Sequence, residues 1–154
     1  GMNQASATVN AYTRVNVETA SQGKLVVMLF DGAIRRAQEA ARLLETGGRR
    51  DEIHKNLVHA QDILAELRNA LDMRRGEIAR NLDRIYEYFQ HLLITANLRK
   101  ETAPIEECVR LMREMRDTWD EAFKKVSREN AELSAGVANH RTAAVSMTAL
   151  NLST

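Results

Sequence analysis

Apolar residues recur at steps of three and four along most of this chain. Four such runs lie between about residue 21 and residue 129, and short segments containing glycine or proline separate them. This spacing places apolar side chains on one face of a helix. Val, Ile and Thr do not alternate with polar residues over the length of a strand. The pattern therefore predicts four helices and no sheet.

Local residue types set the predicted helix ends. The first helix should begin at Ser21, whose hydroxyl can accept from free backbone amides, and end at Gly47-Gly48, since glycine adopts the left-handed conformation readily. The second should begin near Asp51, and Gly76 marks the turn before the third. The fourth should begin around residues 102–104, with Pro104 in its first turn.

Each predicted helix carries one apolar seam. The seam of the first helix is Leu25, Leu29, Ala33, Ala37, Ala40 and Leu44, and that of the third is Ile78, Leu82, Ile85, Phe89, Leu92 and Ala96. The second and fourth seams are Ile53, Leu57, Ala60, Leu64, Leu67 and Leu71, and Ile105, Cys108, Met112, Met115, Trp119, Ala122 and Val126. Seams of this kind are typical of helices crossing at about 20°. Because the links are short, we expect an all-α, antiparallel four-helix bundle.

The two ends of the chain fall outside this bundle. We expect residues 1–20 to form an N-terminal cap segment, residues 21–129 the bundle, and residues 130–154 a tail. Val9 and Tyr12 are three residues apart, so one helical turn would place them on one face. Glu132 and Arg141 are the tail's only charges. The tail is expected to be flexible or disordered, or alternatively a weakly held fifth helix.

Some predicted helices carry more apolar surface than one seam provides. A second stripe lies beside the first seam at Val26, Phe30 and Ile34, and another beside the third at Tyr86, Leu93 and Asn97. Three explanations stay open: the chain's own ends cover these stripes, a partner protein covers them, or the core is thick. We take as candidate partner-binding residues Val9, Tyr12, Val26, Phe30, Ile34, Tyr86, Leu93 and Asn97.

Charge and composition argue against several classes of protein. The chain has 22 basic and 21 acidic residues, without the basic excess of a nucleic-acid binder. Its longest apolar run, residues 25–30, is far shorter than the about 20 residues of a membrane span. The N-terminus lacks the pattern of a secretory signal, and the single cysteine suits a reducing compartment. We therefore expect a cytoplasmic protein with neither nucleic acid nor membrane insertion.

Residues able to support catalysis or bind metal are few. Among four histidines, Glu87 and His91 make the nearest approach to the Glu-x-x-His pair of di-iron bundles, with the wrong spacing and no second copy. Cys108 lies on the fourth seam, where a buried structural thiol is expected. No glycine-rich phosphate loop is present. We expect no catalytic, cofactor or metal site, and hence a binding protein rather than an enzyme.

The order of several short motifs resembles one known family. These motifs are Asn10-Ala11-Tyr12, Val17-Glu18-Thr19-Ala20-Ser21, Met28-Leu29-Phe30-Asp31-Gly32-Ala33, Gly76-Glu77-Ile78-Ala79-Arg80-Asn81-Leu82, Ile85-Tyr86-Glu87-Tyr88, Ala96-Asn97-Leu98, Ile105-Glu106-Glu107 and Trp119. Together they resemble the flagellin-specific export chaperones, the FliS family, over about residues 8–126. Gln22 and Phe30 stand where family members commonly have proline and tyrosine.

The resemblance implies a cytoplasmic bundle that holds the C-terminal region of newly made flagellin, prevents premature polymerisation and presents it to the flagellar type III export apparatus. It also implies that the N-terminal segment, with Val9 and Tyr12, covers part of the client site when that site is empty. We expect a monomer or weak homo-oligomer without a cofactor. The alternative is a helical-bundle interaction protein or homo-oligomer with another client. The tail could also fold back as a pseudo-client through Val145, Met147, Leu150 and Leu152.

Overall fold

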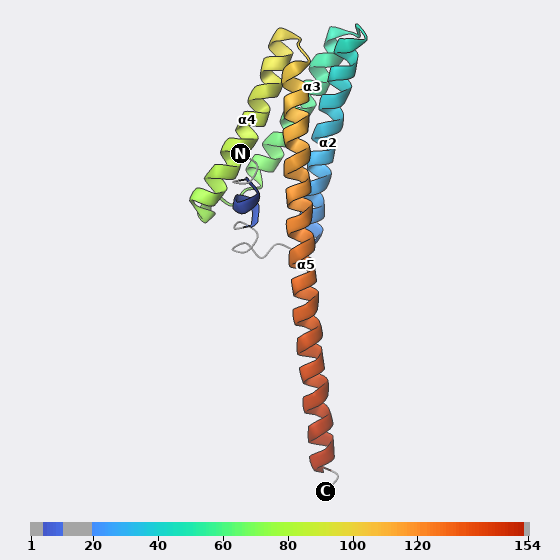
Figure 1. Cartoon of the computed structure of the whole chain (residues 1–154), viewed down its shortest axis with the longest axis vertical. Coiled ribbons are helices and arrows are strands. Elements are labelled where there is room, and N and C mark those ends of the chain that lie inside the picture. The colour runs from blue at the N-terminus through green and yellow to red at the C-terminus, as the bar shows by residue number, and fades with distance from the viewer. Residues whose placement is uncertain (1–4, 11–19, 153–154) are drawn as a thin grey trace.

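A computed structural model describes residues 5–10 and 20–152, and within these residues every regular element is helical. The elements are α2 (Ala20–Glu45), α3 (Arg50–Asn69), the short 3-10 helix η1 (Met73–Arg75), α4 (Glu77–Arg99) and α5 (Ala103–Leu152), with a further short helix over residues 5–10 (Figure 1). The all-α prediction is confirmed.

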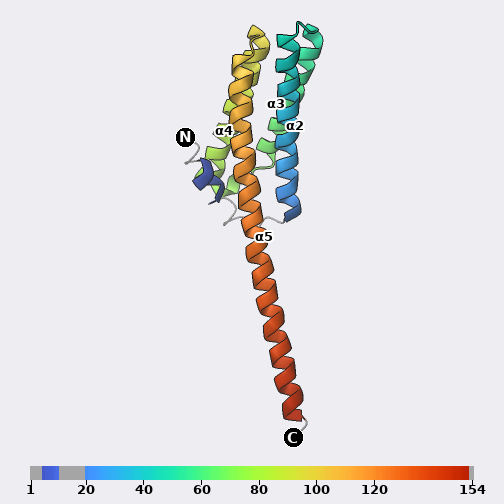
Figure 2. The same ribbon diagram turned by 45° about the vertical axis from the view of Figure 1, so that its right-hand side comes forward.

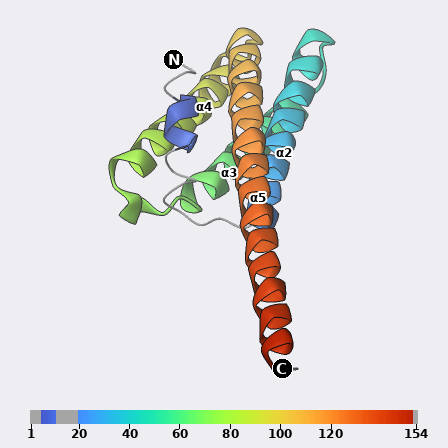
Figure 3. The same cartoon turned by 60° about the horizontal axis from the view of Figure 1, so that its bottom comes forward.

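Helices α2 to α5 run in alternating directions side by side (Figures 1 and 2). α2 packs against α3 and α5, and α4 packs against the same two helices, so that the four enclose one core. The short helix over residues 5–10 lies beside α4 and α5, near the end of the bundle where α2 begins (Figures 1 and 3). This end of the bundle contains the candidate site described below.

The helix ends carry the expected local signals. Asp51 and Glu52 lie in the first turn of α3, where negative charge favours the positive end of the helix dipole. The Asp72 carboxylate accepts from the backbone N–H of Arg74 at the start of η1, 3.1 Å away. Gly76 has a φ of 70°, a left-handed value that side-chain-bearing residues rarely adopt, and it separates η1 from α4.

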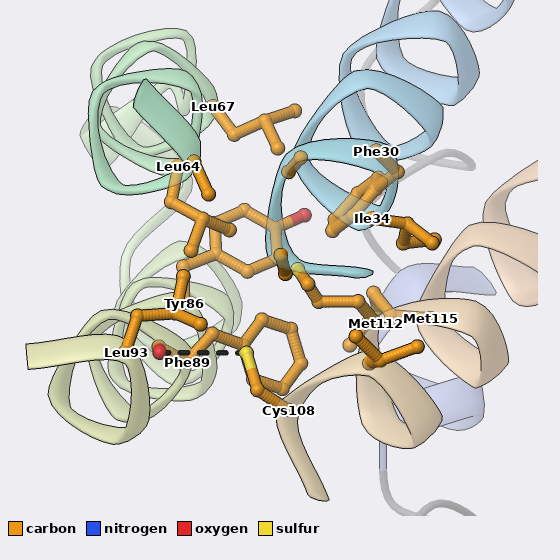
Figure 4. Packing of buried hydrophobic residues seen from close by; sticks show 14 of the residues in the cluster. Phe30, Ile34, Leu64, Leu67, Tyr86, Phe89, Leu93, Cys108, Met112 and Met115 are labelled. Carbon is orange, nitrogen blue, oxygen red and sulfur yellow. Dashed lines mark hydrogen bonds between the residues drawn. The ribbon is translucent and has the colours of Figure 1, made fainter. Parts of the chain in front are cut away.

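The predicted seams of the second and fourth helices account for much of the core. On α3 and α5 every seam residue is buried except Leu71 and Val126, which are half-buried near the bundle's end. Large side chains from α2, α4 and α5 meet at the centre, among them Phe30, Phe89 and Met112 (Figure 4). These side chains exclude water from all four helices at once, which is the main favourable term in folding.

The buried face of α2 is turned relative to its predicted seam. Phe30 and Ile34, placed by the sequence on a second stripe, are buried, whereas Leu25 is 56% exposed and Leu29 half-buried. The buried face of α4 is also turned relative to its predicted seam, since Tyr86, placed on the second stripe, is buried, whereas Ile85 of the seam is only half-buried. Each helix packs against two neighbours, so its buried face is wider than one narrow seam, and the ring side chains fill the centre.

Two polar clusters connect neighbouring helices. The guanidinium of Arg68 on α3 donates to Asp83 on α4 through Nε at 2.8 Å and Nη2 at 3.0 Å, and to Gln90 Oε1 at 2.7 Å. On the other side, Arg116 Nε of α5 donates to Asp31 Oδ1 of α2 at 2.9 Å. These contacts hold α4 against α3 and α5 against α2, and thereby fix the relative positions of the helices.

The tail is helical, as one of the two expectations allowed, but it is not a separate element. α5 continues as one helix from Ala103 to Leu152 and projects beyond the bundle, so the described tail residues are neither disordered nor a separate fifth helix (Figures 1 and 2). No proline follows Pro104, and the tail is rich in alanine, the strongest helix former. A chain division at residue 130 stays a prediction, but the helix does not end there.

Candidate protein-binding groove

The described surface has an apolar cavity of about 200 Å³ at the end of the bundle where α2 begins and α3 ends. Its lining comes from four helices and the loop after α3: Gln22, Leu25, Val26, Leu29, Leu67, Ala70, Leu71, Tyr86, Trp119 and Phe123. Nine of these ten residues lack a charged or amide side chain. The cavity is therefore suited to apolar side chains of another segment rather than to a polar small molecule.

A glycine sets the wall of this cavity where α2 meets α5. Gly23 is buried directly against Phe123, and a Cβ atom added at Gly23 would overlap the Phe123 ring. The two helices can approach closely here only because Gly23 has no side chain. The Phe123 ring also stacks on Trp119, with ring centroids 5.2 Å apart. The close approach thus fixes the aromatic side of the cavity.

The floor of the cavity is buried and hydrogen-bonded. Trp119 Nε1 donates to the Tyr86 hydroxyl at 2.8 Å, and both residues are buried. The Tyr86 ring meets Phe30 edge to face, with centroids 5.6 Å apart. Burying the indole N–H and phenol would be costly without this bond. An incoming segment therefore meets a floor that is already ordered.

A second hollow, of about 560 Å³, lies on the other side of α2. Gly23, Val27, Met28 and Phe123 form its apolar part, and Lys24, Asp120, Lys124, Ser127 and Arg128 surround them. Phe123 contributes to both hollows. Three of the four charged groups are basic, so this hollow favours a segment with an apolar face bordered by acidic groups.

Between the two hollows lies a ridge of exposed apolar side chains on α2. Leu25 is 56% exposed and Met28 is 65% exposed. We call the two hollows and this ridge the bundle-end groove. Methionine is flexible and polarisable, a property that suits surfaces adapting to apolar partners. Exposed apolar residues gathered beside apolar hollows are typical of interaction sites, so the groove is the candidate site.

Comparison with known proteins assigns the chain to a family. The profile of the family described as "Flagellar protein FliS" matches residues 4–126. The chain belongs to the FliS family. Relatives named "Flagellar secretion chaperone FliS" are 36% identical over 127 residues in Salmonella typhimurium, covering 77% of this chain and 92% of the relative. The Bacillus subtilis relative is 30% identical over 128 residues, covering 83% of this chain and 94% of the relative.

A third relative of that name, from Escherichia coli, is 33% identical over 125 residues and covers 77% of this chain and 91% of the relative. The chain therefore belongs to a family of flagellar secretion chaperones, whose partners are proteins of flagellar export. The relatives are named as chaperones, which is a non-catalytic role. The FliS match ends at residue 126, and every described side chain from Arg128 to Arg141 is exposed.

The structure brings only part of the predicted partner-binding set to the groove. Val26 and Tyr86 line the smaller hollow. Phe30, Ile34 and Leu93 are buried in the core, which corrects their placement on a surface stripe. Their neighbours on the other helices cover them, because each helix is buried on a wide face. Whether any of them contacts a partner stays a prediction.

The remaining predicted residues lie elsewhere. Val9 is fully buried and belongs to the same apolar cluster as the bundle core. Tyr12 lies outside the described residues. Asn97 is half-buried at the opposite end of α4, where its Nδ2 lies 2.8 Å from His54 Nδ1 and its Oδ1 accepts from Lys100 Nζ. Asn97 therefore belongs to a polar link between α3 and α4, away from the groove.

Sequence reasoning missed the residues of the ridge. Leu25 was assigned to the core, and Met28 to neither stripe. A signal was present, because residues 25–30 are all apolar. At 100° per residue, such a run covers every side of a helix, so part of it has to face outward. The run therefore indicated an exposed apolar surface on this helix without showing which side faced outward.

Cys108 is buried, its Sγ lies 3.5 Å from the Phe89 carbonyl, and burial raises the pKa of its thiol far above the usual range (Figure 4). A buried structural thiol was the prediction, and it is confirmed. Within residues 5–10 and 20–152 no group of His, Cys, Asp and Glu has the arrangement of a metal site. No helix in this part of the chain has the apolar length needed to cross a bilayer.

Proposed function

We propose that this protein binds the C-terminal region of a flagellin in the cytoplasm, keeps it from polymerising prematurely and delivers it to the flagellar type III export apparatus. The observation that carries the proposal is the bundle-end groove, an ordered apolar site on a chain of the FliS family. An amphipathic segment would lay its apolar face into this groove, a common mode of peptide recognition.

The energetics require more than one hollow. Ordering about 30 client residues costs roughly 30 kcal/mol at about 1 kcal/mol each. Offsetting that cost takes about 1,200 Å² of apolar burial at about 25 cal/mol per Å². The smaller cavity, at about 200 Å³, holds a few side chains only. The client should therefore extend across the ridge of Leu25 and Met28 into the second hollow, and onto further apolar surface.

Exposed apolar residues on α4 provide such surface. Leu98 is 81% exposed and Ile94 is also exposed, and the two are one helical turn apart on the same side of α4. A client that leaves the groove and wraps around the bundle would cover both. A single client wrapped in this way would explain the exposed apolar side chains on both α2 and α4.

We also propose that the N-terminal segment covers part of the client surface in the empty protein. Ala5 and Val9 are buried within the bundle's apolar cluster, although they lie far from it in sequence. If client binding displaces them, the apparent affinity falls in proportion to the fraction of molecules that are open.

Calorimetric titration with a flagellin C-terminal segment tests the groove. Met28→Asp should weaken binding at least about tenfold, equivalent to about 1.4 kcal/mol, because a carboxylate would be buried against apolar client side chains. Gln38→Asp adds the same charge at another exposed position of α2 and serves as the matched control. Deleting residues 2–16 should tighten binding if the cover exists.

Three results would contradict these proposals separately. No binding by the unaltered chain would remove the flagellin function. An equal loss in Met28→Asp and Gln38→Asp would remove the groove as the site while leaving the function in place. Unchanged affinity after the deletion would remove only the N-terminal cover.

A further inference from the structure

The part of α5 beyond the bundle carries an apolar face that the FliS match does not reach. We call residues 130–152 the tail helix. Every side chain described from Arg128 to Arg141 is exposed, with Leu133 at 68% and Val137 at 52% (Figures 1 and 2). At 1.5 Å per residue the tail helix extends for roughly 35 Å. An exposed helix of this length with regular apolar positions is suited to packing against another helix.

The apolar positions of the tail helix continue the core seam of α5. Within the bundle the seam passes through Met115, Trp119 and Ala122, which are buried. Beyond it, two successive steps of four lead from Ala122 to Val126 and Asn130, and alternating steps of three and four then lead to Leu133, Val137, His140, Ala144 and Met147. In the bundle α2 packs against α5, but α2 begins at Ala20, close to Phe123. The same face of α5 therefore continues past the start of its neighbour.

We propose that the tail helices of two copies of this chain pair antiparallel along this seam. A two-fold axis between positions 133 and 137 makes the seam complementary to itself. Leu133 then faces Val137 of the second copy, and helix position 126 lies opposite position 144, both of them apolar in the sequence. Each apolar position meets an apolar one.

The polar seam positions match in the same register. Asn130 of one copy faces His140 of the other, so an amide and an imidazole can share a hydrogen bond instead of entering an apolar layer alone. Gly136 meets its own copy beside the axis, where nothing lies within 4 Å of an added Cβ. The absence of a side chain there lets the two helices approach closely.

The antiparallel direction also avoids a steric conflict. In a parallel pair both bundles would lie at the same end of the paired helices and would collide, because the seam of each α5 leads directly into its own bundle. In the antiparallel pair the bundles lie at opposite ends, and the overlap, about 19 residues from position 126 to position 144, ends where α2 covers each α5. A contact of that length is at the low end of the about 1,200–2,000 Å² of a standard interface, so the dimer should be weak and concentration-dependent.

Analytical ultracentrifugation of the full chain over a range of concentrations tests this pairing. Unaltered protein should pass from monomer to dimer as its concentration rises. Val137→Asp should weaken dimerisation at least about 100-fold, because it places a carboxylate opposite Leu133 in each of two apolar layers. Ala135→Asp is the matched control, since residue 135 is exposed and lies on the opposite side of the helix. Both positions are exposed, so neither change should alter the helical content measured by circular dichroism.

Crosslinking tests the direction of the pair. With a short bismaleimide linker, Gly136→Cys should crosslink to itself in an antiparallel dimer, and Val137→Cys should do so in a parallel one. Cys108 is buried and should not react in the folded protein.

A chain that stays monomeric at all concentrations, or an equal loss of dimer in Ala135→Asp, would overturn the proposal. Preferential crosslinking of Val137→Cys would overturn the antiparallel pairing. If Val137→Asp abolished the binding of a flagellin segment, the pairing would also be overturned, because the client would then occupy the seam.

Discussion

The two halves of α5 share one helix but differ in everything around it. From Ala103 to about residue 126 the apolar seam is covered by α2 and α4, and Met112, Met115 and Trp119 are buried. From residue 130 onward the same spacing continues, yet Leu133 and Val137 are exposed. The regular apolar spacing shows which side of a helix is suited to packing. Whether that side is covered depends on where the neighbouring helix begins.

The largest expected difference between the two halves is in stability, when one seam residue in each half is replaced by alanine. Trp119→Ala should destabilise the protein by about 3–5 kcal/mol, because it removes the stacking on Phe123 and leaves the buried Tyr86 hydroxyl without its indole donor. Leu133→Ala should change stability by less than about 0.5 kcal/mol, since the side chain is exposed. Urea unfolding followed by circular dichroism, at a concentration where the chain is monomeric, measures both. Comparable losses would show that the tail packs against the bundle.

Two glycines allow a smaller difference in stability to be measured: Gly23 of α2, which packs on the covered half of α5, and Gly136 in the exposed half. Gly23→Ala should cost about 1–3 kcal/mol, because the new methyl group overlaps the Phe123 ring and forces α2 away from α5. Gly136→Ala should instead stabilise the monomer by up to about 1 kcal/mol, since its surroundings are open and alanine favours helix. Thermal unfolding of the two variants should therefore shift in opposite directions. Shifts of the same sign would contradict the contrast between the halves.

The smallest effect concerns the polar contact between α3 and α4. The hydrogen bonds from Arg68 hold the pKa of the Asp83 carboxyl below its usual value. The contact is therefore fully stabilising above the about 3.9 of an unfolded Asp, and it is lost as pH falls through the lower folded-state pKa. Asp83→Asn should cost about 0.5–1 kcal/mol near pH 6 and much less near pH 3, as measured by urea midpoints.

The matched control for that measurement is Asp62→Asn, which removes an exposed carboxylate from α3. Its effect should be small at both pH values. If Asp83→Asn were equally destabilising at both, the ionised carboxylate would contribute nothing and the contact would act through shape alone.

The helices and most of the core followed from the sequence because local spacing determines them. The seams of α3 and α5 were predicted almost residue by residue, since Leu, Ile and Met alternate there with charged residues. On α2 the apolar run over residues 25–30 gives no local preference for one side. Its rotation is set by Phe30 meeting Tyr86, a contact between residues 56 positions apart in sequence. Spacing within one helix cannot contain that information.

The candidate site could be predicted only in kind. Surplus apolar residues indicated a binding surface, but the hollows exist because α2 begins opposite Phe123 and α3 ends at Asn69. Those boundaries leave Leu25 and Met28 exposed. The continuation of α5 was missed for a related reason. A segment with few charges and no covering neighbour reads as disordered, although alanine-rich sequence favours helix locally.

The position of Trp119 gives this protein a built-in optical reporter. It is the chain's only tryptophan, it is almost fully buried, and its ring forms part of the smaller hollow. Any segment that fills the hollow changes the surroundings of one indole and of no other. Intrinsic emission can therefore follow occupancy of the groove in real time, without a dye attached to either molecule.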